Sequence, residues 1–179
     1  MLDEMAPLNA RLATEAKEAD RKHFPLKCGF GLNTGFAVVG NMGSEQRFDY
    51  SVLGDIVNLA ARLEGQSKFY GVDIVLGSDT RAQVPDMATI ELDLIQVRGK
   101  TVAVNIFALL GDEEMEKTGS FRTLRDNHKQ MIATYRVQGW EIAKAKLREC
   151  RILCEPFGLG QLYDLYEIRI TEYEANSPA

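Results

Sequence analysis

Apolar side chains recur at helical intervals in the opening segment. Steps of three and four separate the members of this set: Leu2, Met5, Leu8, Leu12 and Ala16. This spacing places side chains on one face of an α-helix. We therefore expect a helix that buries one side and runs to about Lys22, stopping before Pro25. Its regular part should begin near Pro7, because proline is tolerated only in a first helical turn.

Short apolar runs separated by turn residues follow, a pattern typical of strands. Residues 26–33 and 36–40 flank the turn-forming pair at 34–35, which predicts a hairpin. We expect a loop over residues 41–45 and a further strand over residues 48–53.

The middle of the chain alternates helical and extended patterns. Gly54 ends the strand pattern, and Asp55, a residue type that favours helix N-caps, opens a helix to about Lys68. The segments expected after it are a buried strand over 73–76, a short helix over 78–83, and a hairpin of strands over 88–97 and 102–110. This order predicts an α+β fold with antiparallel hairpins and helices that cover one face of a sheet.

Beyond residue 111 the pattern is helical. A glycine-bounded acidic stretch, residues 112–119, is expected to link residues 1–111 to a helical extension at 120–179. The helices of the extension are expected over residues 120–138, 140–154 and 159–175. They faintly resemble one tetratricopeptide pair, but a single such unit cannot bury a solenoid core. We therefore expect them to pack on the preceding domain or to form dimer contacts.

Composition and charge narrow the function classes. The 179 residues are 45% hydrophobic and 26% charged, as in soluble globular proteins. A net charge of −5 without a basic cluster argues against nucleic acid as a partner. No apolar run in the sequence is long enough to span a membrane, and the opening segment does not read as a signal peptide. We expect a cytoplasmic location, either for the chain itself or as the cytoplasmic part of a membrane-anchored parent.

Cysteine and histidine supply no catalytic motif in the sequence. The three cysteines fit no recognised disulfide spacing and suit a reducing compartment. We interpret Cys150 and Cys154 as two small apolar residues on one helix face. His23 and His128 lie in no metal or nucleophile motif, and we expect both as surface residues of a helix or a helix end.

A polar stripe marks the helix that opens at Asp55. At about 100° per residue, Asn58, Arg62 and Gln66 lie in line with Asp55, beside an apolar stripe. On spacing alone, this is the solvated face of an amphipathic helix.

The run from Gly31 to Gly65 changes that interpretation. Its segments GLNTG, VVGN, FDYSVLGD and VNLAARLE stand in the order and spacing of class III nucleotidyl cyclases, which the chain strongly resembles up to about residue 110. The helical extension more weakly resembles the extensions of some bacterial cyclases with extracytoplasmic sensor domains. The resemblance implies a partial ferredoxin-like sandwich and, as function, the conversion of ATP to 3',5'-cyclic AMP and pyrophosphate in signal transduction.

The resemblance also implies roles for four side chains. Asn58 would orient the ribose, and Arg62 would stabilise charge on the phosphate; an amide and a guanidinium four residues apart on a helix suit both tasks. Ser51 stands where the family reads the base, and its hydroxyl resembles the adenine readers; the alternative is a backbone hydrogen bond at a strand end. Lys100, or Arg98 in its place, would meet the terminal phosphates.

The metal ligands of the family are expected outside this chain. The resemblance implies two divalent ions, Mg²⁺ or Mn²⁺, held by aspartates on strands that precede the first helix. Asp3 and Asp20 lie on that helix and cannot replace them. We therefore expect a fragment with no metal ligands and no turnover by itself. We also expect a homo-oligomer, formed where the missing strands leave a sheet edge open.

Two other function classes stay open. In the first, the chain is a catalytically inert cyclase-like module for regulation or dimerisation. In the second, it is an interaction protein that acts through residues 120–179. Intact Asn58 and Arg62 favour catalysis over both, although a subunit that only supplies these groups to a partner also fits.

Overall fold

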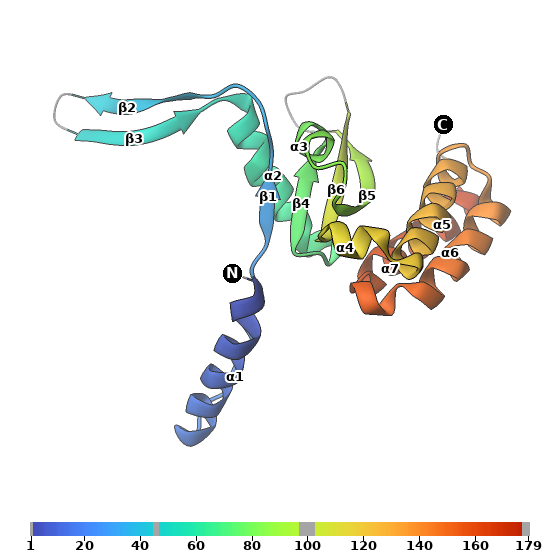
Figure 1. The fold of residues 1–179 in the computed structure, drawn as a ribbon, viewed down its shortest axis with the longest axis horizontal. Helices are drawn as coiled ribbons and strands as arrows, with labels where there is room; N and C mark the ends of the chain where they lie inside the picture. Colours follow the sequence, from blue (N-terminus) through green and yellow to red (C-terminus); the bar gives the residue numbers. More distant parts are fainter. Residues whose placement is uncertain (1, 45–46, 97–102, 177–179) are drawn as a thin grey trace.

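The computed structural model describes residues 2–44, 47–96 and 103–176 (Figure 1). Its helices are α1 (Leu2–Glu18), α2 (Asp55–Tyr70), α3 (Ser78–Gln83), α4 (Glu113–Lys117), α5 (Gly119–Arg136), α6 (Trp140–Leu153) and α7 (Gly160–Ala175), with a 3-10 turn η1 (Glu155–Phe157). Its strands are β1 (Phe30–Leu32), β2 (Val38–Ser44), β3 (Arg47–Leu53), β4 (Ile74–Gly77), β5 (Ala88–Ile95) and β6 (Val104–Gly111). The predicted fold class, α+β with antiparallel hairpins and a helical extension, is confirmed.

Four strands form the central sheet in the order β1-β4-β6-β5. β1 runs parallel to β4, whereas β6 runs antiparallel to both β4 and β5. The predicted hairpin of β5 and β6 is therefore confirmed. Because β1 and β4 are parallel, the chain must cross over between them, and α2 lies in that crossover and packs on both strands.

Strands β2 and β3 form a separate antiparallel hairpin that projects from the sheet (Figure 1). The hairpin predicted across residues 34–35 is therefore wrong, because β1 pairs with β4 instead. The loop predicted at residues 41–45 is also wrong over its described part. Residues 41–44 continue β2 and pair with residues 47–50 of β3. Pairing with β3 satisfies their backbone groups, which local turn preferences did not indicate.

Helix α1 extends away from the sheet (Figure 1), and none of its residues is buried. The predicted buried side is wrong because no element in the described parts of the chain covers it. The helix also runs through Pro7 and ends at Glu18, not near Lys22. Asn9 then holds the returning chain: its side-chain amide donates to the Leu26 carbonyl (2.9 Å) and accepts from the Leu26 amide (2.7 Å).

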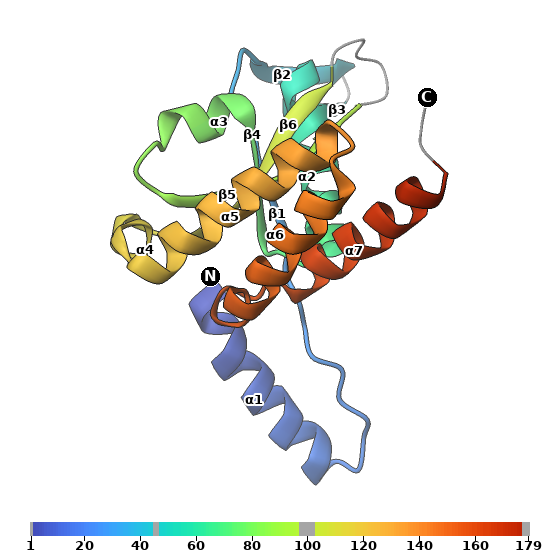
Figure 2. The ribbon, with the colours of Figure 1, turned by 90° about the vertical axis from the view of Figure 1, so that its right-hand side faces the viewer.

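The C-terminal helices cover the sheet on the side that faces the viewer in Figure 2. Their bounds agree with the prediction to within two residues. One continuous core contains Leu63 of α2, Val75 and Ile106 of the sheet, and Leu124 and Leu162 of the extension. The expectation that these helices pack on the preceding domain is therefore confirmed. No helix in the described segments is long and apolar enough to cross a membrane.

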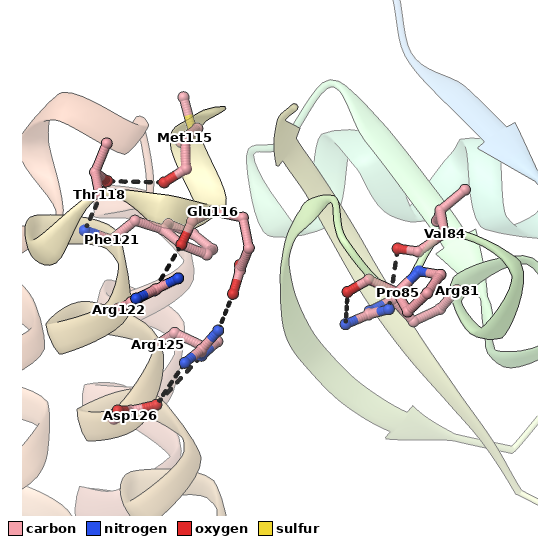
Figure 3. A network of polar contacts seen from close by, with 10 residues as sticks. All are labelled: Arg81, Val84, Pro85, Met115, Glu116, Thr118, Phe121, Arg122, Arg125 and Asp126. Carbon is pink, nitrogen blue, oxygen red and sulfur yellow. Dashed lines mark hydrogen bonds and ion pairs between the residues drawn. The ribbon is translucent and has the colours of Figure 1, made fainter. Parts of the chain in front are cut away.

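The segment predicted as a linker, residues 112–119, contains helix α4. Figure 3 shows how it is joined to α5: the Thr118 hydroxyl accepts from the Phe121 amide (3.3 Å), and Arg125 forms an ion pair with Glu116. These contacts fix the angle between the two helices. Core residues lie on both sides of this segment and belong to one cluster. The domain boundary at residues 112–119 therefore stays a prediction.

His128 of α5 is buried, with 2% of its surface exposed, and so the prediction of a surface histidine is wrong. Its Nε2 lies 2.6 Å from the Glu91 carbonyl oxygen, and its Nδ1 lies 3.2 Å from the Tyr163 hydroxyl. A carbonyl only accepts, so Nε2 must carry the proton and Nδ1 accepts from Tyr163. This arrangement suits a neutral ring. Cys150 and Cys154 are buried free thiols, as expected.

Acid should destabilise the fold through His128. Burial lowers the pKa of this ring from 6.5 to about 4. The unfolded chain therefore binds a proton in a pH range where the folded chain does not, and stability falls as pH drops from 6.5 to 4. The expected loss in the free energy of unfolding is on the order of 3 kcal/mol. Urea denaturation at pH 7.5 and pH 4.5 measures it: His128→Gln should remove most of this loss, whereas His23→Gln should not. An equal loss in both variants would contradict the assignment.

Candidate functional site

Helix α2 carries the predicted catalytic pair on its exposed side. Leu59 and Leu63 are buried in the core, whereas Asn58 and Arg62 are exposed. Four residues of helix rise separate the two polar side chains by about 6 Å along the axis. The structure thus places both groups on one open face of one rigid element, from which they can reach a common ligand.

Strand β1 holds α2 through a very close approach at Gly31. A Cβ at this position would lie 2.2 Å from the Ala60 carbonyl oxygen and 2.3 Å from the Glu64 amide nitrogen. Both atoms belong to the helix backbone and cannot move aside without displacing the helix. Only glycine therefore permits this separation of β1 and α2, and this separation sets the depth of Asn58 and Arg62.

Asn33 fixes the first turn of α2. Its side-chain amide donates to the Ile56 carbonyl (3.1 Å). A Cβ on Gly77 would lie 2.4 Å from Asn33 Oδ1, so this side chain also packs directly against Gly77. The side chain thus joins the end of β1 to the helix and to the end of β4. Our prediction of site residues missed Asn33, although it lies in the GLNTG segment that carries the resemblance.

Gly54 directs the chain from β3 into α2. Its φ of 154° and ψ of 155° lie in a region that essentially only glycine occupies, and a Cβ there would also lie 3.2 Å from the Phe36 carbonyl oxygen. Gly54, not Asp55, is the N-cap residue, and no side chain caps the helix. The first amides of α2 therefore receive no capping hydrogen bond from a side chain at this position.

Ser51 lies on β3, three residues before that turn. It is half-buried and stands opposite Gly40 in the hairpin register. The structure therefore places Ser51 on the strand that leads directly into α2. Lys100 and Arg98 lie outside the described residues.

The described residues do not form a metal site. Within residues 2–44, 47–96 and 103–176, no group of three His, Cys, Asp or Glu side chains lies close enough to hold an ion. The divalent ions that the resemblance implies therefore do not fit the side chains present here, and no chemical step is assigned to a metal in this chain.

Two cavities in the structure lie away from the predicted catalytic pair. One of about 440 Å³ lies between the start of β4, the end of β6 and η1, and one of about 560 Å³ lies between α2 and α7. Neither is lined by Ser51, Asn58 or Arg62. The candidate residues Asn58 and Arg62 instead lie on the exposed face of α2.

The comparison with protein families supports the motif assignment. The model described as "Adenylate and Guanylate cyclase catalytic domain" matches residues 2–111. "Adenylate cyclase 1" of Rhizobium meliloti is 39% identical over 83 residues, which are 46% of this chain and 12% of that protein.

Solved cyclase structures give partial matches. The adenylyl cyclase CyaB from P. aeruginosa is 28% identical with a TM-score of 0.47, covering 57% of this chain and 52% of that chain. The guanylyl cyclase Cya2 is 30% identical with a TM-score of 0.46, covering 60% of this chain and 51% of that chain. The chain therefore spans a small part of its curated relative and about half of each solved chain.

The close approach at Gly31 can be tested by adding one methyl group. Gly31→Ala should reduce the free energy of unfolding by about 1–3 kcal/mol, because the methyl group overlaps the backbone of α2. Gly65→Ala, at a position within α2, is the matched control. No atom lies within 4 Å of its added Cβ, and alanine favours helix by about 1 kcal/mol. Urea denaturation measures both, and a Gly31→Ala variant as stable as the wild type would contradict the packing.

Proposed function

Because the chain belongs to the adenylate and guanylate cyclase catalytic-domain family, we propose that it supplies the nucleotide-orienting part of a cyclase that converts ATP to 3',5'-cyclic AMP and pyrophosphate. The observation that carries the proposal is the placement of Asn58 and Arg62 on one exposed face of α2. The helix is held at its first turn by Asn33 and along its length by β1.

The reaction needs two kinds of positioning that this face can provide. The ribose 3'-oxygen attacks the α-phosphorus, a new O–P bond forms, the bond to pyrophosphate breaks, and the proton of the 3'-hydroxyl passes to solvent water. Asn58 holds the ribose so that this oxygen stays in line with the leaving group. Arg62, which is always charged, donates to phosphate oxygens as negative charge moves toward pyrophosphate. Both side chains act without a change of their own protonation.

Ser51 is proposed to favour adenine over guanine. It lies on the strand that precedes α2, so a base placed beside β3 would leave the ribose and phosphates near the helix. A hydroxyl both donates and accepts and can therefore satisfy the adenine edge. Lys100 is proposed to contact the terminal phosphates.

Divalent ions and a second subunit complete the proposal. Class III cyclases use divalent metals, and the ions, Mg²⁺ or Mn²⁺, would be held by groups other than the described residues of this chain. Without those groups, the chain by itself should not turn over. Phe36, Val38 and Tyr50 on and beside the hairpin have relative exposures of 102%, 68% and 76%. Such apolar surface favours self-association, which would also enclose the open face of α2.

An inert cyclase-like module for dimerisation is the second candidate function. The same exposed hairpin favours it, because association needs no catalytic residues. The substitutions below separate the two functions, since an inert module shows no dependence of product formation on Arg62.

Removing the guanidinium should slow the reaction. Arg62→Ala in the full-length protein is expected to reduce kcat on the order of 10²-fold, because a donor to the transition-state charge is lost. Folding should be unaffected, since exposed helix positions change stability by only about 0.5 kcal/mol. Cyclic AMP production with ATP and Mn²⁺ is the measurement. Lys68→Ala, which removes another exposed cation of α2, is the control, and a wild-type kcat in Arg62→Ala would refute the assignment.

Removing the hydroxyl should weaken base selection. Ser51→Ala is expected to lower the ratio of kcat/KM for ATP to that for GTP roughly tenfold, the effect of one lost hydrogen bond. Ser51→Thr keeps a hydroxyl and should keep the preference. Steady-state kinetics with both nucleotides measure the ratio. An unchanged ratio in Ser51→Ala would locate base reading elsewhere.

A further inference from the structure

The helical extension reaches the far end of the helix that carries the catalytic pair. The side-chain amide of Gln161, in the first turn of α7, donates to the carbonyl oxygens of Lys68 (2.8 Å) and Phe69 (2.9 Å). These carbonyls belong to the last turn of α2, where no further helical amide can reach them. Gln161 is 92–93 residues away from them in the sequence, so this cap depends on the packing of the extension.

We propose that Gln161 is a positioning residue for Asn58 and Arg62: it holds the C-terminal end of α2 and so sets where the two side chains stand. This inference rests on the proposed cyclase function, because it concerns the same reaction. It adds a role for the helical extension, which acts on the site through α2 without contacting the nucleotide.

A second contact joins the extension to the same end of the helix. Tyr70, the last residue of α2, donates its hydroxyl proton to Asp93 Oδ2 (2.7 Å), and Arg169 of α7 donates to the same oxygen (2.6 Å). Burial and the hydrogen bond to Asp93 raise the pKa of Tyr70, which keeps its donor protonated. The end of α2 is therefore tied to both β5 and α7.

Gln161 also packs against the residue that ends α2. Gly71 ends α2 with a left-handed φ of 71°, and a Cβ there would lie 2.7 Å from Cβ of Gln161. The Gln161 side chain thus packs directly over the helix end in addition to its two hydrogen bonds. The arrangement leaves α7 little freedom to move without moving the end of α2.

The helix transmits this restraint to the catalytic pair. Its first turn is held by Asn33, its middle by Gly31 and its end by Gln161. Because the helix is rigid, a displacement of its last turn is passed along the axis toward Asn58, about 18 Å from Tyr70, and acts against the contacts at Gly31 and Asn33. A misplacement of about 1 Å at a reacting group costs up to about 10²-fold in rate. Partial release of the end should therefore lower kcat roughly tenfold.

Two substitutions separate the hydrogen bonds from the packing. Gln161→Met keeps a side chain of similar length but has no donor. Gln161→Lys keeps a donor, and a cation is favourable at a helix C-terminus. The matched control is Gln130→Met, the same substitution at an exposed position of α5.

The first measurement is steady-state kinetics in the full-length protein, well below its unfolding temperature. Gln161→Met should lose about tenfold in kcat with little change in KM, and Gln161→Lys and Gln130→Met should stay near the wild type. A residue that only stabilised the fold would lower the melting temperature and leave kcat unchanged. If Gln161→Met keeps its kcat while Arg62→Ala loses activity, the inference is wrong and the proposed function stands.

The second measurement does not depend on activity. Hydrogen exchange in the 179-residue chain should become faster for the amides of residues 57–62 in Gln161→Met and should be restored in Gln161→Lys. Faster exchange confined to residues 68–72 would overturn the coupling. If Arg62→Ala has wild-type kcat, the proposed function fails, and the exchange of residues 57–62 alone decides whether the extension controls the helix.

Discussion

The packing of α2 on β1 is the constraint on which the rest of the structure depends. At Gly31 the strand and helix backbones are so close that no side chain fits between them. This contact places the apolar stripe of α2, with Leu63, in the common core and leaves the neighbouring stripe, with Asn58 and Arg62, in solvent. The face proposed to bind nucleotide is therefore a consequence of how the helix is buried, because a helix rotated about its axis would turn that stripe away from solvent.

The same helix explains why so many distant segments meet. Asn33 reaches its first turn from β1, Gly54 sets the angle at which it leaves the hairpin, and Gln161 and Tyr70 hold its last turn. Each contact satisfies a backbone group or fixes a direction that the helix itself cannot determine. A group that must meet a transition state needs such support, since its error in position must stay near 0.5 Å.

The chain combines a closed core with exposed surfaces to which we assign the proposed functions. Core side chains from α2, the sheet and the extension form one cluster, so the extension packs directly on the sheet and α2. By contrast, the hairpin region exposes Phe36, Val38 and Tyr50, and the proposed catalytic pair lies on an exposed face of α2. Apolar exposure of this kind is costly in water and is covered when subunits associate, so catalysis and assembly are proposed to use neighbouring surfaces.

The sequence by itself determined the features that depend on local periodicity and on a dense motif. It predicted α2 and α3, the β5–β6 hairpin and the three long C-terminal helices, and its motifs identified the cyclase family. Tertiary structure decided the partner of β1, the length of β2, the burial of His128 and the contact of Gln161 with α2. These depend on residues tens of positions apart, and no local pattern encodes which strand will pair or which carbonyl will lack a donor. The apolar stripe of α1 correctly predicted a helix, but no residue of that helix is buried. Burial requires another element that packs against the stripe, and the periodicity of one segment does not show whether such an element exists.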